Sequence, residues 1–95
     1  MSTTIGFLEL TFDVVQASSL KDKRRAVKSF KDRIRHRHNV SIAEVDGQDN
    51  HRRAVLAVAM VGNDHRYVEG VLQQIVNAAE MHRDMVLLDT EVSWL

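Results

Sequence analysis

Basic side chains are concentrated in one stretch of the chain, SLKDKRRAVKSFKDRIRHRH at residues 19–38. Nine lysines and arginines but only two aspartates lie between residues 20 and 38, whereas the rest of the chain carries four basic and eleven acidic residues. The formal net charge of zero therefore conceals a strongly dipolar molecule. Lysine and arginine are the side chains that bind phosphate oxygens, so this stretch is a candidate nucleic-acid surface.

The spacing of the cations places many of them on one side of a helix. At about 100° per residue, six of them fall across roughly a third of the helix surface. They are Lys21, Arg24, Arg25, Lys28, Lys31 and Arg35. A solvated helix usually mixes opposite charges at i,i+4, yet here Lys28 and Asp32 are the only such mixed pair. This pattern favours binding to a polyanion; the alternatives are a solvated surface, or one that pairs with the acidic part of a second copy.

The start of this helix adds to the same chemistry. Ser19 followed three residues later by Asp22 resembles a capping box. Free backbone NH groups of the first turn, with the hydroxyl of Ser18 or Ser19 and the nearby cations, provide the donors that a phosphate needs. Lys23 falls on the apolar side of the helix, and we expect its stem to lie on the core while its ammonium group reaches water.

Other site chemistry is sparse in this chain. There is no cysteine, which excludes disulfides and thiolate metal sites and fits a reducing compartment. No phosphate-binding loop, nucleophile elbow or zinc-protease helix motif occurs. We therefore expect a binding module without catalytic residues, cofactor or metal, and no small-molecule substrate.

Hydrophobic periodicity predicts six elements that would position these residues. Alternation indicates strands, a 3.6-residue period indicates helices, and DGQDN at residues 46–50 is typical of a turn. A second helix follows Asn63 or Asp64, with an apolar stripe that begins at Tyr67 and with Gly70 on its polar side. In chain order the elements are strand 5–15, helix 20–37, strand 39–46, strand 54–61, the second helix, and strand 85–95.

The βαββαβ order is that of ferredoxin-like α+β domains. Right-handed crossovers then give a four-stranded antiparallel sheet of order 4-1-3-2 with both helices on one face. The 95 residues fit a single domain over residues 1–95, in which residues 1–4 form a flexible tail. Neither an export signal nor a long apolar span is present, so we expect a cytoplasmic location without a membrane partner.

The strand at 54–61 is apolar on both faces, so one face needs a cover. An uncovered apolar face invites association, and we expect a homodimer. The strand carries no aromatic residue, which argues against the base-stacking sheet of an RNA-recognition motif. The face away from the helices is either Val55, Ala57, Ala59 and Val61 or Ala54, Leu56, Val58 and Met60.

Four stretches of the chain resemble the YlxP-like family of small bacterial proteins. They are GFLEL at 6–10, SLKDKRRAVKS at 19–29, NVSIAEVDGQD at 39–49, and the closing DTEVSWL. The resemblance implies a ferredoxin-like domain. Because members are commonly encoded beside ribosome maturation and translation initiation factors, it also implies a role near the ribosome or RNA. Asn50, His51 and Arg52 stand where the family pattern leads us to expect an apolar or aromatic residue.

These observations predict a module that docks structured, ribosomal RNA or a ribosomal particle through the first helix. The family-like hairpin offers a possible second contact surface, made of Glu44, Asp46, Gln48 and Asp49. The alternative is a dimeric structural or regulatory domain that binds a protein and has no nucleic-acid role.

Overall fold

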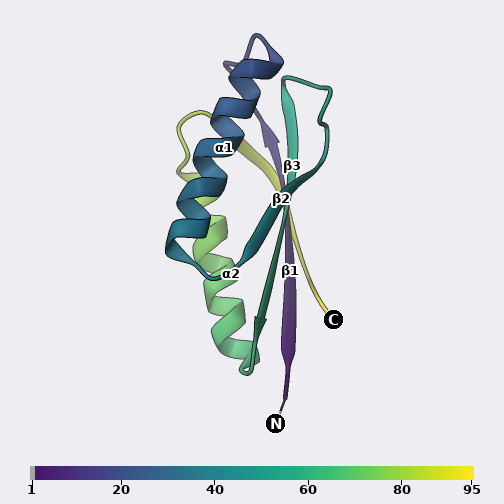
Figure 1. Ribbon diagram of the computed structural model, residues 1–95, viewed down its shortest axis with the longest axis vertical. Helices are drawn as coiled ribbons and strands as arrows, with labels where there is room; N and C mark the ends of the chain where they lie inside the picture. Colours follow the sequence, from purple (N-terminus) through teal and green to yellow (C-terminus); the bar gives the residue numbers. More distant parts are fainter. Residues whose placement is uncertain (1) are drawn as a thin grey trace.

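A computed structural model describes residues 2–95 of the chain. Its six elements follow the predicted order (Figure 1). They are β1 (Thr4–Asp13), α1 (Leu20–Arg37), β2 (Ser41–Asp46), β3 (Arg53–Gly62), α2 (His65–Glu80) and β4 (Val86–Trp94). The bounds of the basic helix agree with those predicted. The predicted tail at residues 1–4 lies partly outside the described residues, and Thr4 already belongs to β1.

The four strands form one antiparallel sheet in the order β2-β3-β1-β4. This is the predicted order read from the other edge, and both helices lie on one side of the sheet (Figure 1). The ferredoxin-like α+β fold is therefore confirmed. β1 and β3 are the central strands of the sheet, and β2 and β4 are its two edge strands.

The core lies between the helices and alternate residues of the central strands. Leu8, Leu10 and Phe12 of β1 are buried and pair directly with residues of β3 that are also buried. Phe12 meets Phe30 of α1 edge-on, with ring centroids 5.4 Å apart. The register settles the open question about β3, because directly paired residues share a face. Ala54, Leu56, Val58 and Met60 face the helices, and Val55, Ala57, Ala59 and Val61 face away.

The end of β1 and the start of β2 each differ from the prediction by two residues, and the pairing of β4 with β1 has a local irregularity. β1 ends at Asp13 because a turn begins at Val14, whose carbonyl accepts from the N–H of Ala17. β2 begins only at Ser41, since the N–H of Val40 is bonded to His38. A shift of register between Thr11 and Phe12 places Leu87 opposite Phe12, which leaves Leu88 exposed.

Tyr67 does not belong to the core stripe of α2, contrary to the prediction. Its side chain is 65% exposed, while Val68, Leu72 and Ile75 are buried. Adjacent helix residues point about 100° apart, so Tyr67 lies just outside the buried sector. Gly70 is on the exposed side, as predicted. Within residues 2–95 no helix is long and apolar enough to cross a membrane.

Close packing of α2 on β1 requires a glycine. A Cβ atom at Gly6 would lie 2.9 Å from Leu72 Cδ1 and 2.9 Å from Trp94 Cζ3, closer than real Cβ contacts. A Cβ at Gly70, in contrast, would meet no atom within 4 Å. Gly6 therefore sets how near α2 and Trp94 come to the sheet.

We predict opposite effects for alanine at these two glycines. Gly6→Ala should lower the free energy of unfolding by about 1–3 kcal/mol because the side chains of Leu72 and Trp94 must shift to make room for the methyl group. Gly70→Ala should raise it by up to about 1 kcal/mol because alanine favours the helix. Urea unfolding of both variants measures the difference. A Gly6→Ala protein as stable as the wild type would contradict this packing.

Candidate nucleic-acid interface

The first turn of α1 is capped as predicted, with one difference. Ser19 Oγ accepts from the N–H of Asp22 at 3.1 Å, and Asp22 Oδ2 accepts from both the N–H and the hydroxyl of Ser18, at 3.1 and 2.9 Å. These Ser18 hydrogen bonds hold the pKa of Asp22 below its ordinary value. The donors expected for a phosphate at Ser18 are thus taken by a carboxylate. An anion at the helix start would face Asp22, so the flanks of the helix are the better binding surfaces.

Four of the six predicted cations line one groove between α1 and β2. They are spaced by four, three and four positions, which places them side by side over roughly 16 Å of helix. The groove has a volume of about 330 Å³, and we call it the β2 groove. Its lining consists of Arg24, Val27, Lys28, Lys31, Asp32, Arg35 and Glu44.

Within the β2 groove, two of the four cations form ion pairs and the other two do not. Asp32 accepts from Lys28 at 2.6 Å and lies 3.8 Å from Arg35, and the Lys28 bond lowers the pKa of Asp32. Arg35 also donates to the carbonyl of Ile42 in β2 at 3.0 Å. In residues 2–95, Arg24 and Lys31 form no ion pair. Solvent screens exposed pairs such as Lys28 with Asp32, so these pairs contribute little to stability and a phosphate could displace Asp32.

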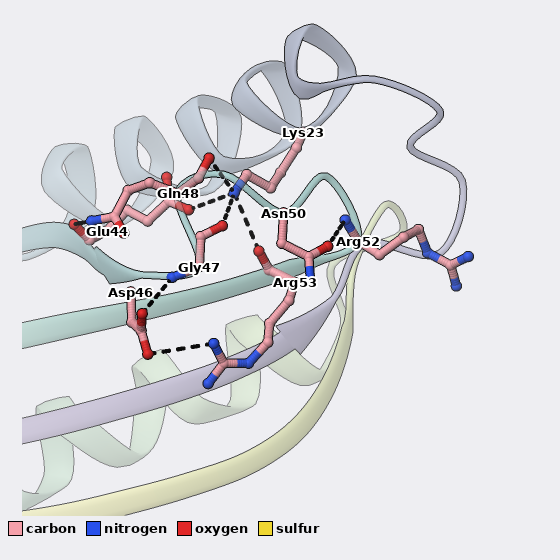
Figure 2. Close-up of polar contacts among 8 residues, drawn as sticks. All are labelled: Lys23, Glu44, Asp46, Gly47, Gln48, Asn50, Arg52 and Arg53. Atoms are coloured by element: carbon pink, nitrogen blue, oxygen red, sulfur yellow. Dashed lines mark hydrogen bonds and ion pairs between the residues drawn. The ribbon is translucent and has the colours of Figure 1, made fainter.

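Glu44 does not neutralise this groove, because its charge is balanced by Lys23. Figure 2 shows Lys23 reaching from α1 to the loop between β2 and β3. Its Nζ lies 2.9 Å from Glu44 Oε2 and 2.6, 3.2 and 3.3 Å from the carbonyl oxygens of Gly47, Arg53 and Gln48. We call this arrangement the Lys23 clamp. The side chain is 1% exposed, so the prediction that its ammonium group reaches water was wrong.

The loop is shaped to present those carbonyls. Gly47 has φ of 80°, a left-handed conformation that glycine adopts without strain, and its N–H donates to Asp46 Oδ1 at 2.8 Å. That bond, with Arg53 Nη1 at 3.4 Å from Asp46 Oδ2, lowers the pKa of Asp46. Asn50 Oδ1 accepts from the N–H of Arg52 at 2.9 Å. Asn50, one of the three residues that depart from the family pattern, therefore helps to close the turn.

The possible second contact surface is partly used within the fold. Glu44 and the Gln48 carbonyl bind Lys23, and Asp46 pairs with Arg53. Asp49 is exposed. A contact of these residues with a partner stays a prediction.

The other two predicted cations lie outside the β2 groove. Lys21 is exposed on the first turn of α1. Arg25 lines a different hollow, of about 280 Å³, together with Asp22 and Asp84. The β2 groove therefore takes in four of the six residues, and the other two lie elsewhere on the exposed side of α1.

Two further arginines come together where sequence reasoning did not place them. Arg33 of α1 and Arg83 of the α2–β4 loop line a hollow of about 350 Å³, which we call the loop groove. Its other lining residues are Ser29, Met81, His82 and Asp84. Arg83 lies fifty positions from Arg33, and no local pattern in the sequence could have joined them.

His82 fixes the floor of the loop groove. Its ring packs edge-on against Phe30 with centroids 5.7 Å apart, and its Nδ1 accepts from the N–H of Asp84 at 3.3 Å. Burial lowers the pKa of His82, and the positive charge of Arg33 lowers it further, although Asp84 opposes the shift. The imidazole is thus neutral at neutral pH. Across the described residues, no three His, Asp or Glu side chains are grouped so as to hold a metal ion.

Two solved structures share this architecture. The de novo designed protein Foldit4 is 14% identical, with a TM-score of 0.59, over 99% of this chain and 97% of its own. The de novo designed protein Ferredog-Diesel is 16% identical, with a TM-score of 0.54, over 97% and 84% of the two chains. Together with the sheet order, they define the class: a ferredoxin-like α+β domain.

Sequence comparison then assigns the family. The model for a protein of unknown function (DUF503) matches residues 5–92. The "Uncharacterized protein YlxP" of Bacillus subtilis (strain 168) is 30% identical over 90 residues, covering 95% of this chain and 98% of that protein. The chain belongs to the DUF503 family, and the YlxP-like resemblance is confirmed.

The Lys23 clamp yields a stability prediction. Lys23→Met keeps the apolar stem but leaves Glu44 and three carbonyls without the ammonium group, and should lower the free energy of unfolding by about 3 kcal/mol. The double variant Lys23→Met/Glu44→Gln should recover part of the loss, because the uncompensated carboxylate is gone. Urea unfolding measures both.

Lys21→Met is the matched control, since Lys21 is exposed two positions away. It should change the free energy of unfolding by less than about 0.5 kcal/mol. Equal effects of Lys21→Met and Lys23→Met would contradict the clamp.

Proposed function

We propose that the protein is a non-catalytic module that docks structured RNA through the β2 groove. The observation that carries the proposal is the row of four cations in that groove, of which Arg24 and Lys31 have no ion-pair partner within residues 2–95. Such a row matches the spacing of charge along a phosphate backbone. Binding is then driven by the release of the counterions that are condensed on the nucleic acid.

The chemistry of the groove favours backbone contacts over base reading. Its lining includes no aromatic side chain on which a base could stack. The opposite face of the molecule is unsuited to nucleic acid, because the register sets Glu9 beside Glu91 and Thr11 beside Asp89 on the side away from the helices. RNA therefore approaches from the side of α1.

Ribosomal RNA or a ribosomal particle is the ligand that we infer. The support is the association of YlxP-like genes with ribosome maturation and translation initiation factors. With that ligand, the protein would act in the cytoplasm. The step it serves would be ribosome maturation or translation.

The test replaces the two unpaired cations of the groove. Arg24→Gln/Lys31→Gln should weaken binding to ribosomal subunits and structured ribosomal RNA fragments at least tenfold near 0.1 M salt. The slope of log K against log salt should become shallower by nearly one for each phosphate that the variant no longer neutralises. Fluorescence anisotropy across a salt series gives both quantities.

Arg66→Gln is the control, because Arg66 is an exposed arginine at the start of α2, outside both grooves. It should leave the affinity and slope close to the wild-type values. If the double variant folds normally and binds RNA with unchanged affinity and slope, the proposed function is wrong.

A second candidate is assembly through the open face of the sheet. At one end of this face, Ile5, Phe7, Ala59 and Val61 form an uncharged patch, in which Val61 is 61% exposed. The acidic residues Glu9, Asp89 and Glu91 occupy the other part. A second copy related by a two-fold axis through the patch would bury it while keeping the two acidic parts apart. We infer that a homodimer forms in this way, as in a structural or regulatory protein-interaction domain.

The oligomeric state tests this inference. Val61→Glu should turn a dimer into a monomer in sedimentation equilibrium, because it places a charge on the most exposed part of β3 within the patch. Val92→Glu is the control: Val92 is also an exposed valine, but the register puts it on the helix side of β4. A wild-type protein that is monomeric at high concentration would overturn the dimer.

A further inference from the structure

α1 is bordered by a basic groove on each side. The β2 groove lies on one flank, and the loop groove, with Arg33 and Arg83, lies on the other. Arg24 and Arg33 are nine positions apart, so at about 100° per residue they project about 180° from one another. The helix therefore forms a ridge with cations on both slopes.

The loop groove has the donors that a phosphate needs. Arg33 and Arg83 are exposed and make no ion pair within residues 2–95, and the exposed Ser29 adds a hydroxyl. Asp84 is the one carboxylate among the lining residues, and the neutral His82 beneath them adds no charge. Two free guanidinium groups thus outweigh one acid.

A single strand cannot reach both grooves without wrapping around the helix. An α-helix with its side chains is about 10–12 Å wide, and the two sets of cations point in opposite directions across it. The two strands that border one groove of a duplex, in contrast, present phosphates on both sides of an inserted ridge.

We propose that the ligand of α1 is double-helical RNA, with the ridge in its minor groove, one strand along the β2 groove and the other against Arg33 and Arg83. This inference rests on the proposed function. The minor groove of A-form RNA is wide and shallow, whereas its major groove is too deep and narrow for side chains to read.

The crest of the ridge suits the floor of that groove. Between the two flanks α1 exposes Arg25 and His36, and Asp32 lies where this crest borders the β2 groove. These side chains combine donors with a carboxylate acceptor. A carboxylate repels phosphate but accepts a hydrogen bond from a ribose 2′-hydroxyl, which lines the minor groove of RNA and is absent from DNA. Asp32 therefore favours an RNA duplex over a DNA duplex.

The experiment compares the two flanks on three ligands: a 20-base-pair RNA duplex, one of its strands alone, and the same duplex as DNA. The wild type should prefer the RNA duplex to each of the others by at least fivefold. Arg33→Gln/Arg83→Gln should weaken duplex binding about tenfold and make the salt slope shallower by nearly two, because each arginine neutralises one phosphate and each phosphate adds close to one to the slope. It should leave single-strand binding unchanged.

The variants separate failure of this inference from failure of the proposed function. If Arg24→Gln/Lys31→Gln weakens RNA binding but Arg33→Gln/Arg83→Gln changes neither affinity nor slope, RNA occupies one flank and the two-strand arrangement is wrong. Equal or tighter binding of the single strand also overturns it. If neither double variant has an effect, the β2 groove is not an RNA site. Arg66→Gln serves as the control in each series, and unfolding curves verify that all variants fold.

Discussion

The ammonium group of Lys23 joins α1 to the β2–β3 hairpin, and the geometry of the basic surface depends on that contact. One buried cation binds a carboxylate and three backbone carbonyls that belong to the end of β2, the turn and the start of β3. Because an unpaired charge in such a place costs several kcal/mol, the loop and the helix can hardly move independently. The distance from α1 to the edge of the sheet is fixed in this way, and with it the width of the β2 groove.

The clamp also explains how an acidic residue can line a basic groove. Glu44 is one wall of that groove, yet its charge is balanced from beneath by Lys23. Asp32, in contrast, is held only by exposed partners at the surface. The two carboxylates therefore have different roles: Glu44 is part of the framework, and Asp32 can exchange partners when a ligand approaches.

Hydrogen bonds and nearby cations lower the pKa values of Asp22, Asp32 and Asp46. These contacts therefore stabilise the fold above the ordinary carboxyl pKa and weaken as the pH falls through the lowered values.

Most of the fold could be predicted from the sequence because its signals are local. Alternation in β1, the Ser19–Asp22 cap and the turn at Gly47 each involve residues a few positions apart, and together they define βαββαβ. The misplaced residues depend on contacts distant in sequence. The partners of Lys23 lie 21 to 30 positions away and three are backbone carbonyls, which leave no trace in residue identity. Arg83 comes near Arg33 only because the α2–β4 loop packs on α1. The exposure of Tyr67 could be predicted only by knowing the rotation of α2 about its axis on the sheet.

The hydrogen bond from Arg35 to the carbonyl of Ile42 has a consequence for the border of the sheet. β2 is an outermost strand, and unpaired backbone groups on such strands can recruit a strand from another chain and start aggregation. Arg35 occupies one of these acceptors, and the basic groove lies along the same border. An incoming strand would have to displace a guanidinium group and then lie beside a row of hydrated cations. The charge that suits α1 to a polyanion thus also protects this edge of the sheet against unwanted extension, whereas the other edge strand, β4, has Leu88 and Val92 exposed and carries no such row of cations.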